Sequence, residues 1–174
     1  MSGGFDVSNP EKSLSSVVKY QTDGTFQVLP ELRVKRRGHA CASFLSDLGE
    51  TVVLVTGGYN ALHFPHLDST ELMVDFSDWR PAANLPYGRE YLSAASLDRK
   101  IFIFGNEIQS YLGFQIEKMN SGGYHGKVFF DGKFINSILY YDTETDTWHP
   151  AGNLTTPRRR HAMALFPGVD RVCP

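Results

Sequence analysis

His63 and His66 have the spacing that comes nearest to a metal-binding motif in this chain. Two imidazoles separated by two residues can bind one zinc or copper ion, and Asp68 could add an oxygen ligand. No third and fourth ligand stands at a suitable spacing. The chain also has no Ser in a Gly-x-Ser-x-Gly turn, and its Cys, His and Asp residues form no recognisable catalytic set. We therefore predict no catalytic residue, no metal ion and no cofactor.

Basic residues are concentrated at two points of the chain. The clusters are Arg33, Lys35, Arg36 and Arg37, and then Arg158, Arg159 and Arg160. Short basic runs can direct nuclear import or bind nucleic acid. A net charge of −2 with 21% charged residues, however, gives no general attraction to nucleic acid or to an anionic membrane. We therefore expect neither as a partner.

The start of the chain has no signal-peptide h-region, and no apolar run approaches the length of a transmembrane helix. These features favour a cytoplasmic location, although the sequence leaves the compartment open.

The elements that position these residues recur along the chain. Gly57-Gly58 and Gly105-Asn106 each follow an apolar run, and Gly3-Gly4 stands at the same point of an earlier copy. Equivalent positions, such as Gly3 and Gly57 or Arg37 and Arg89, are separated by slightly more than fifty residues. A self-similar period of this length is typical of propeller blades rather than of helical repeats.

The repeated pattern resembles the kelch repeat over nearly the whole chain. The resemblance rests on the double glycine after an apolar strand, on Tyr141-Asp142 with Trp148 a few residues later, and on the Arg-x-His that opens a new copy at 37–39 and 159–161. The chain departs from the pattern at Asn106, where a second glycine is expected, at Phe26, where a Trp is expected, and at Tyr91, where a His is expected.

Strand signals agree with this resemblance but do not depend on it. Residues 51–56 and 101–104 are short β-branched and aromatic runs bounded by Gly, Asp or Asn, and no window repeats its apolar residues at helical spacing. Each repeat is therefore expected to form four short antiparallel strands, of which the first contains the small residues at 39–43. The predicted fold class is all-β, a partial kelch-type β-propeller of four-stranded antiparallel blades.

We predict a single incomplete propeller domain over residues 1–174. Its parts are a partial blade at 1–32, a full blade at 37–85, a full blade at 89–154 with an insertion at 107–134, and the start of a further blade at 159–174. Propellers need about four to eight blades to close, so the chain reads as a fragment of a longer propeller. Uncovered edges and faces favour association, and we expect self-association through the uncapped blades.

Two repeated features are expected to have structural roles. Gly57 and Gly58 end a strand where the backbone turns sharply or the next blade approaches closely, because both situations require a positive φ or the absence of a Cβ. Trp79 and Trp148 recur at the same place in successive copies, as expected of residues that pack blade against blade.

One face of the predicted propeller gathers the candidate binding residues. In a four-stranded antiparallel blade, the loop between strands two and three and the connection to the next blade lie at the same end. The two basic clusters, the loop 59–68 and the insertion 107–134 should therefore share one face, and repeat scaffolds carry function in such loops. The predicted partner-binding residues are Arg36, Arg37, Tyr59, Asn60, His63, His66, Arg158 and Arg159. An alternative role for Arg37 and Arg159 is to bond backbone carbonyls of adjacent blades.

The predicted function is a non-catalytic protein–protein interaction module. The kelch resemblance implies that this face binds a protein or peptide ligand, with acidic segments as one class. Two alternatives stay open. The chain could be a fragment of a propeller-fold enzyme similar to galactose oxidase, although Tyr140 and Tyr141 are better explained by packing than as copper ligands. It could also be part of the substrate-receptor propeller of a ubiquitin-ligase adaptor, which would require a BTB domain.

Overall fold

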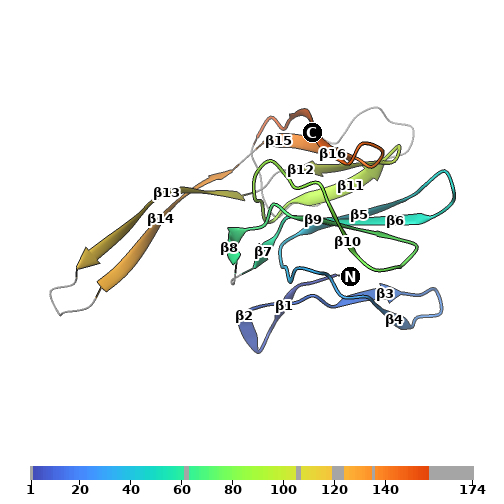
Figure 1. Cartoon of the computed structure of the whole chain (residues 1–174), viewed down its shortest axis with the longest axis horizontal. Coiled ribbons are helices and arrows are strands. Elements are labelled where there is room, and N and C mark those ends of the chain that lie inside the picture. The colour runs from blue at the N-terminus through green and yellow to red at the C-terminus, as the bar shows by residue number, and fades with distance from the viewer. Residues whose placement is uncertain (1, 61–62, 105–106, 119–123, 135, 157–174) are drawn as a thin grey trace.

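The computed structural model describes residues 2–60, 63–104, 107–118, 124–134 and 136–156. Within these ranges every regular element is a β-strand (Figure 1). The same ranges contain no helix that is long and apolar enough to cross a membrane. The predicted all-β class is therefore confirmed.

The central blade is a four-stranded antiparallel sheet. Its strands are β5 (Ala40–Leu45), β6 (Thr51–Thr56), β9 (Thr70–Val74) and β10 (Arg80–Ala82). They lie in the order β10-β9-β6-β5, and a small hairpin of β7 (Tyr59–Asn60) and β8 (His63–His66) interrupts the meander between β6 and β9. The run of Val, Leu and Thr in β6 is mostly buried, as expected of a strand that is packed on both faces.

The next blade repeats this plan with a much longer hairpin. Its sheet has the order β11-β12-β15-β16, formed by β11 (Ser93–Leu97), β12 (Lys100–Phe104), β15 (Ser137–Asp142) and β16 (Thr147–Asn153). The predicted insertion forms β13 (Glu107–Lys118) and β14 (Tyr124–Phe134), which pair with each other and extend away from the sheets (Figure 1). Both sheets confirm the prediction of four-stranded antiparallel blades.

The N-terminal part forms two short two-stranded sheets. One consists of β1 (Phe5–Asp6) and β2 (Asn9–Ser13), and the other of β3 (Val17–Tyr20) and β4 (Phe26–Leu29). The β3–β4 pair corresponds to the third and fourth strands of a blade. Asp23 closes its turn, because its carboxylate accepts hydrogen bonds from the backbone N–H and the hydroxyl of Thr25. The expected start of a further blade at 159–174 lies outside the described residues.

Neighbouring sheets are joined by packed seams, each of which contains a tryptophan. Trp79 is 4% exposed, and its indole Nε1 donates a hydrogen bond to the Pro30 carbonyl at 3.0 Å. Trp148 Nε1 donates to the Ala83 carbonyl at 2.8 Å across the next seam. Both tryptophans therefore pack blade against blade, as predicted. The first seam contains Val17, Leu29, Leu32, Val55, Met73 and Trp79, and the second contains Val52, Leu54, Leu72, Ile101, Tyr141 and Trp148.

The β3–β4 sheet presents the same kind of face with little covering it. Tyr20 pairs with Phe26 across the strands, as Tyr141 pairs with Trp148 in the later blade. The side chains of this face, which we call the open face, are Tyr20, Phe26 and Val28, at 65%, 61% and 79% exposure. The two rings contact each other, with their centroids 5.3 Å apart. Phe26 therefore stands at the repeat position that packs between blades elsewhere, but no described sheet packs against it.

Candidate functional site

The hairpins and the turns lie at opposite ends of the sheets. The β1–β2, β7–β8 and β13–β14 hairpins project from one end in Figure 1, and the turns after β3, β5 and β11 lie at the other. We call these ends the hairpin face and the turn face. The connections between blades also reach the hairpin face, because Arg37 pairs with Tyr59 of β7. Antiparallel pairing thus brings the loop 59–68 and the 107–134 hairpin to one end.

Main-chain hydrogen bonds join the glycine pairs to the connections between blades. Gly4 N–H donates to the Arg36 carbonyl at 2.9 Å, and Gly58 N–H donates to the Arg89 carbonyl at 2.6 Å. Gly57 has a φ of +68°, and a Cβ placed on it would lie 2.7 Å from the Arg89 carbonyl oxygen. The prediction that this pair permits a turn and a close approach is confirmed.

These bonds also fix which residues of successive repeats are equivalent. Arg36 N–H donates to the Leu14 carbonyl at 3.0 Å, and Arg89 N–H donates to the Leu67 carbonyl at 3.1 Å. Arg36 is therefore the counterpart of Arg89, and the expected equivalence of Arg37 with Arg89 is wrong by one residue. Two consecutive arginines allow both alignments in the sequence, and the backbone bonds decide between them.

Arg36, predicted as a partner-binding residue, is fully buried and bonded within the chain. Its exposure is 0%, and Nη1 donates to the carbonyls of Gly57 and Ser69 at 2.7 and 3.0 Å. Nη2 donates to Glu71 Oε1 at 2.6 Å. The other carboxylate oxygen of Glu71 accepts the Arg33 N–H at 2.7 Å. The side chain therefore ties a connection between blades to the sheet that follows it, and both charges are balanced.

Arg37 and Tyr59 form a contact that remains partly accessible on the hairpin face. The Arg37 guanidinium carbon lies 4.7 Å from the centre of the Tyr59 ring, and both residues are half-buried. Their backbones bond reciprocally at 2.8 and 3.0 Å, which fixes the pair in place. The ring and cation attract each other electrostatically. Asn60, predicted beside them, is only 6% exposed, so its interaction with a partner is not supported.

His66 lies against Glu90, which the sequence did not single out. His66 Nδ1 is 3.8 Å from Glu90 Oε1, and the two side chains are 6% and 13% exposed. The ring centroids of His66 and Tyr59 are 6.3 Å apart. Glu90 follows Arg89 as Arg37 follows Arg36, so the correct repeat alignment would have identified it. His66 is thus brought together with Arg37 and Tyr59, but mostly below the surface.

The remaining predicted residues are not placed. The side chain of His63 and the residues Arg158 and Arg159 lie outside the described part of the chain. Among the side chains that are described, no three His, Cys, Asp or Glu are grouped so that they could hold a metal ion.

His39 lies beneath the hairpin face at the start of the inner strand. Its Nε2 is hydrogen-bonded to Ser2 Oγ at 3.0 Å. Burial, followed by the positive charge of Arg36, lowers the pKa of His39 to about 4. The imidazole is therefore neutral at neutral pH.

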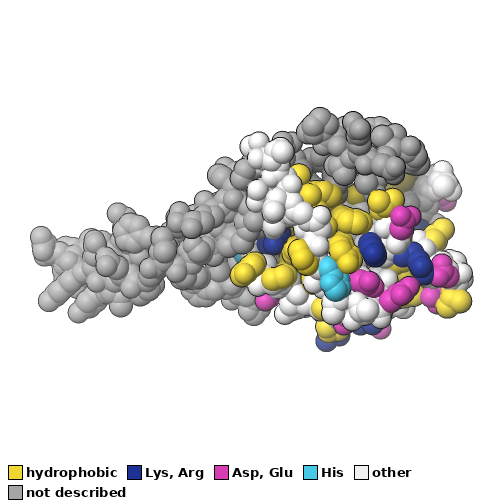
Figure 2. Space-filling model, turned by 90° about the horizontal axis from the view of Figure 1, so that it is seen from above, with side chains coloured by type: hydrophobic (Ala, Val, Ile, Leu, Met, Phe, Trp, Pro, Cys, Tyr) yellow, Lys and Arg dark blue, Asp and Glu magenta, His cyan; other side chains and the backbone are white. Residues whose placement is uncertain are grey.

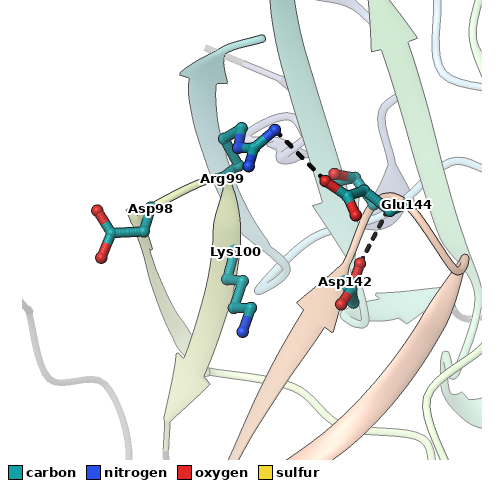
Figure 3. A pocket seen from close by; sticks show the side chains of 6 residues that line it. Asp98, Arg99, Lys100, Asp142 and Glu144 are labelled. Carbon is teal, nitrogen blue, oxygen red and sulfur yellow. Dashed lines mark hydrogen bonds and ion pairs between the residues drawn. The ribbon is translucent and has the colours of Figure 1, made fainter. Parts of the chain in front are cut away.

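The turn face carries a different surface, in which charges of both signs are paired. Charged side chains gather at this end (Figure 2), where Arg99 forms ion pairs with Asp47 and with Glu144. A shallow depression of about 330 Å³ lies between β12 and β15 (Figure 3). It is lined by Asp98, Arg99, Lys100, Asp142, Thr143 and Glu144. The exposed charges of Arg99, Asp47 and Glu144 therefore balance one another on the turn face.

Residues 121–155 match the sequence profile of the Kelch motif. The match supports a kelch-repeat family for this chain. Alpha-scruin and beta-scruin of Limulus polyphemus are each 25% identical to it over 179 residues, which cover 98% of this chain and 17% of the relative. The chain therefore spans a small part of the length of the curated relatives that it matches. The solved structure of YjhT shares its fold, with a TM-score of 0.55 at 17% identity over 80% of this chain and 34% of that one.

Proposed function

We propose that this kelch-repeat chain is a non-catalytic protein–protein interaction module that binds a protein or peptide segment on its hairpin face. The central contact is the Arg37–Tyr59 pair, with acidic peptide segments as the preferred ligand class. His63, Arg158 and Arg159 belong to the same proposal as additional contacts. Arg36 and Asn60 do not, because both are buried.

The observation that carries the proposal is the fixed orientation of Arg37. Its backbone N–H and its carbonyl both form hydrogen bonds with Tyr59 of β7, and its guanidinium lies over the Tyr59 ring. A partner would therefore meet a cation and an aromatic ring that are already in position, which lowers the conformational entropy lost on binding. Arg and Tyr are also the residue types that dominate binding energy at protein interfaces.

An array of acidic peptides, each paired with a version in which Asp and Glu become Asn and Gln, tests the proposal. We expect acidic peptides to bind and their amide versions to bind more weakly. Arg37→Glu should lower the affinity at least about tenfold, because charge reversal at an interface replaces an attraction by a repulsion.

The matched control is Arg99→Glu on the turn face. Arg99 is a paired and exposed cation, so its reversal should leave peptide affinity unchanged while costing at most about 1 kcal/mol of stability. The proposal fails if Arg99→Glu removes binding and Arg37→Glu does not. Both variants should first be shown to unfold cooperatively.

Self-association through the uncapped blades is a second part of the proposal. The open face supports it, because three large apolar side chains are more than half exposed there, and contiguous apolar patches of this kind mark interaction sites. A cytoplasmic location belongs to the same proposal.

A further inference from the structure

Arg36 and Arg89 hold the same repeat position but have different surroundings. Both are buried, at 0% and 2% exposure. The carbonyl of each accepts a hydrogen bond from the second glycine of a glycine pair. The two side chains therefore start from equivalent backbone sites.

In the Arg36 site both terminal nitrogens of the guanidinium have partners, while Nε has none. Its guanidinium reaches two carbonyl oxygens, the hydroxyl of Ser69 at 3.1 Å and the carboxylate of Glu71. The carboxylate also accepts the backbone N–H of Arg33 at Oε2 and that of Val34 at Oε1. The positive charge is thus matched by a negative charge of the same chain.

Among the described residues, none supplies this carboxylate at the Arg89 site. Glu71 pairs with Val55 on β6, and Leu139 pairs with Ile103 on β12. Val55 and Ile103 are each the last residue but one of their strand, so Leu139 stands where Glu71 stands in the preceding blade. A leucine offers no group that can accept a hydrogen bond or balance a cation.

Two side chains that the repeat comparison assigns to this site carry polar atoms without partners. Arg89 Nε and Nη1 are buried and have no hydrogen-bond partner, and the same is true of the hydroxyl of Ser137. Ser137 precedes Leu139 by two residues, as Ser69 precedes Glu71. Arg89 Nη1 and the Ser137 hydroxyl are therefore the counterparts of groups that are bonded in the Arg36 site, whereas Nε has no partner in either arginine.

A buried and unpaired guanidinium is costly, because burial removes its water without supplying another partner. Burial lowers the pKa of Arg89 to about 10, so the group still carries its charge at neutral pH. An anion that reaches it would gain charge-assisted hydrogen bonds. The Arg36 site shows which anion this geometry accommodates, since a carboxylate occupies it there.

We propose that Arg89 and Ser137 bind a carboxylate group supplied by a ligand. Arg89 supplies the charge and the N–H donors, and the Ser137 hydroxyl donates a further hydrogen bond. The ligand is a small carboxylic acid or an acidic residue of a protein segment. This site does not depend on the Arg37–Tyr59 contact, so either proposal can fail without the other.

Thermal unfolding in sodium acetate and in sodium chloride, at equal ionic strength and pH, tests the site. Acetate should raise the Tm of the chain by several degrees relative to chloride, because a ligand that binds only the folded state stabilises it. Arg89→Leu should abolish this difference. Leu139→Glu should abolish it too, because it places a carboxylate of the chain at the site, and it should raise the Tm in chloride.

The mirror variant Glu71→Leu keeps the proposal falsifiable if Arg89→Leu does not fold. It recreates the incomplete site around Arg36, so its Tm should respond to acetate more strongly than the Tm of the unaltered chain does. The proposal is overturned if acetate has no specific effect on the unaltered chain, or if the effect is undiminished in Leu139→Glu.

A second arm identifies the source of the carboxylate. A short peptide with one Glu is compared with its Gln version in the same unfolding assay. If acetate and the Glu peptide both stabilise, the site accepts a carboxylate carried by a protein segment. If acetate alone does so, it accepts only small acids. Either result supports the site, and no response to any of the probes refutes it.

Discussion

Trp79 and Phe26 occupy the same position on the same face of successive repeats, yet one is 4% and the other 61% exposed. Trp79 is covered by the β3–β4 sheet and donates its indole N–H to Pro30. Phe26 contacts Tyr20 of its own sheet. The difference teaches that repeat position selects an aromatic side chain, whereas burial comes from the neighbouring blade.

The two faces should therefore contribute very differently to stability. A covered seam stabilises the folded chain, because it removes apolar surface from water and contains an indole hydrogen bond. The open face retains most of its contact with solvent. Substitutions at the seam between the β3–β4 sheet and the central blade should be far more costly than substitutions on the open face.

Trp79→Ala tests the covered seam most directly. Its loss should lower the free energy of unfolding by about 3 to 5 kcal/mol, because a large side chain leaves a cavity between two sheets. Urea denaturation measures this change. Trp148→Ala, at a half-buried position in the next seam, should also be destabilising but less so. A loss below about 1 kcal/mol at Trp79 would contradict its role in packing.

Arg36→Met tests the polar clamp that crosses the same seam. Removing the guanidinium leaves the Glu71 carboxylate buried, so we expect a loss of about 3 kcal/mol in the free energy of unfolding. The adjacent Arg37→Met is the matched control and should cost less than about 1 kcal/mol. Equal losses in the two variants would show that the assignment of the buried arginine is wrong.

The protonation of His39 should make the free energy of unfolding depend on pH. Its pKa is about 4 in the folded chain, against about 6.5 in an unfolded one. The unfolded state therefore binds the proton first as pH falls, so this contribution is present above about pH 6.5 and is lost toward pH 4. The loss should be of order 1 to 3 kcal/mol.

Urea midpoints at pH 7 and pH 4.5 measure this effect. His39→Gln should reduce the difference between the two midpoints, since the uncharged side chain does not titrate. A difference identical to that of the unaltered chain would mean that other groups cause the pH dependence.

Phe26→Ser tests the open face and should have the smallest effect on stability, within about 0.5 kcal/mol. Its effect on association should be larger, because it removes an exposed ring from the apolar patch. Sedimentation velocity at several protein concentrations should show less self-association in this variant. If self-association is unchanged in this variant, the chains do not associate through the open face.

Much of the fold could be predicted because its signals are local. Glycine pairs after apolar runs and the spacing of Trp79 and Trp148 are sufficient to place the blades and their seams. The exposure of Phe26 could not be predicted, because it depends on what lies opposite and not on the residue itself.

The candidate site was harder to predict for a related reason. The burial of Arg36 depends on Glu71, which is distant in sequence, and on a shift of one residue between two adjacent arginines. The difference between the Arg36 and Arg89 sites depends on Leu139, which stands on another strand at the position of Glu71. Such pairings are visible only after the sheets are aligned by their hydrogen bonds.

The β1–β2 and β7–β8 hairpins are each closed at their base by a main-chain bond. Leu14 N–H donates to the Gly4 carbonyl at 2.9 Å, and Leu67 N–H donates to the Gly58 carbonyl at 2.7 Å. A closed base separates the length of the hairpin from the geometry of the blade, and the strands that it closes have 2 and 5 residues in β1 and β2 and 2 and 4 in β7 and β8. For protein engineering, this junction is a natural grafting point, where a foreign binding loop could replace β7–β8 without altering the sheet beneath it.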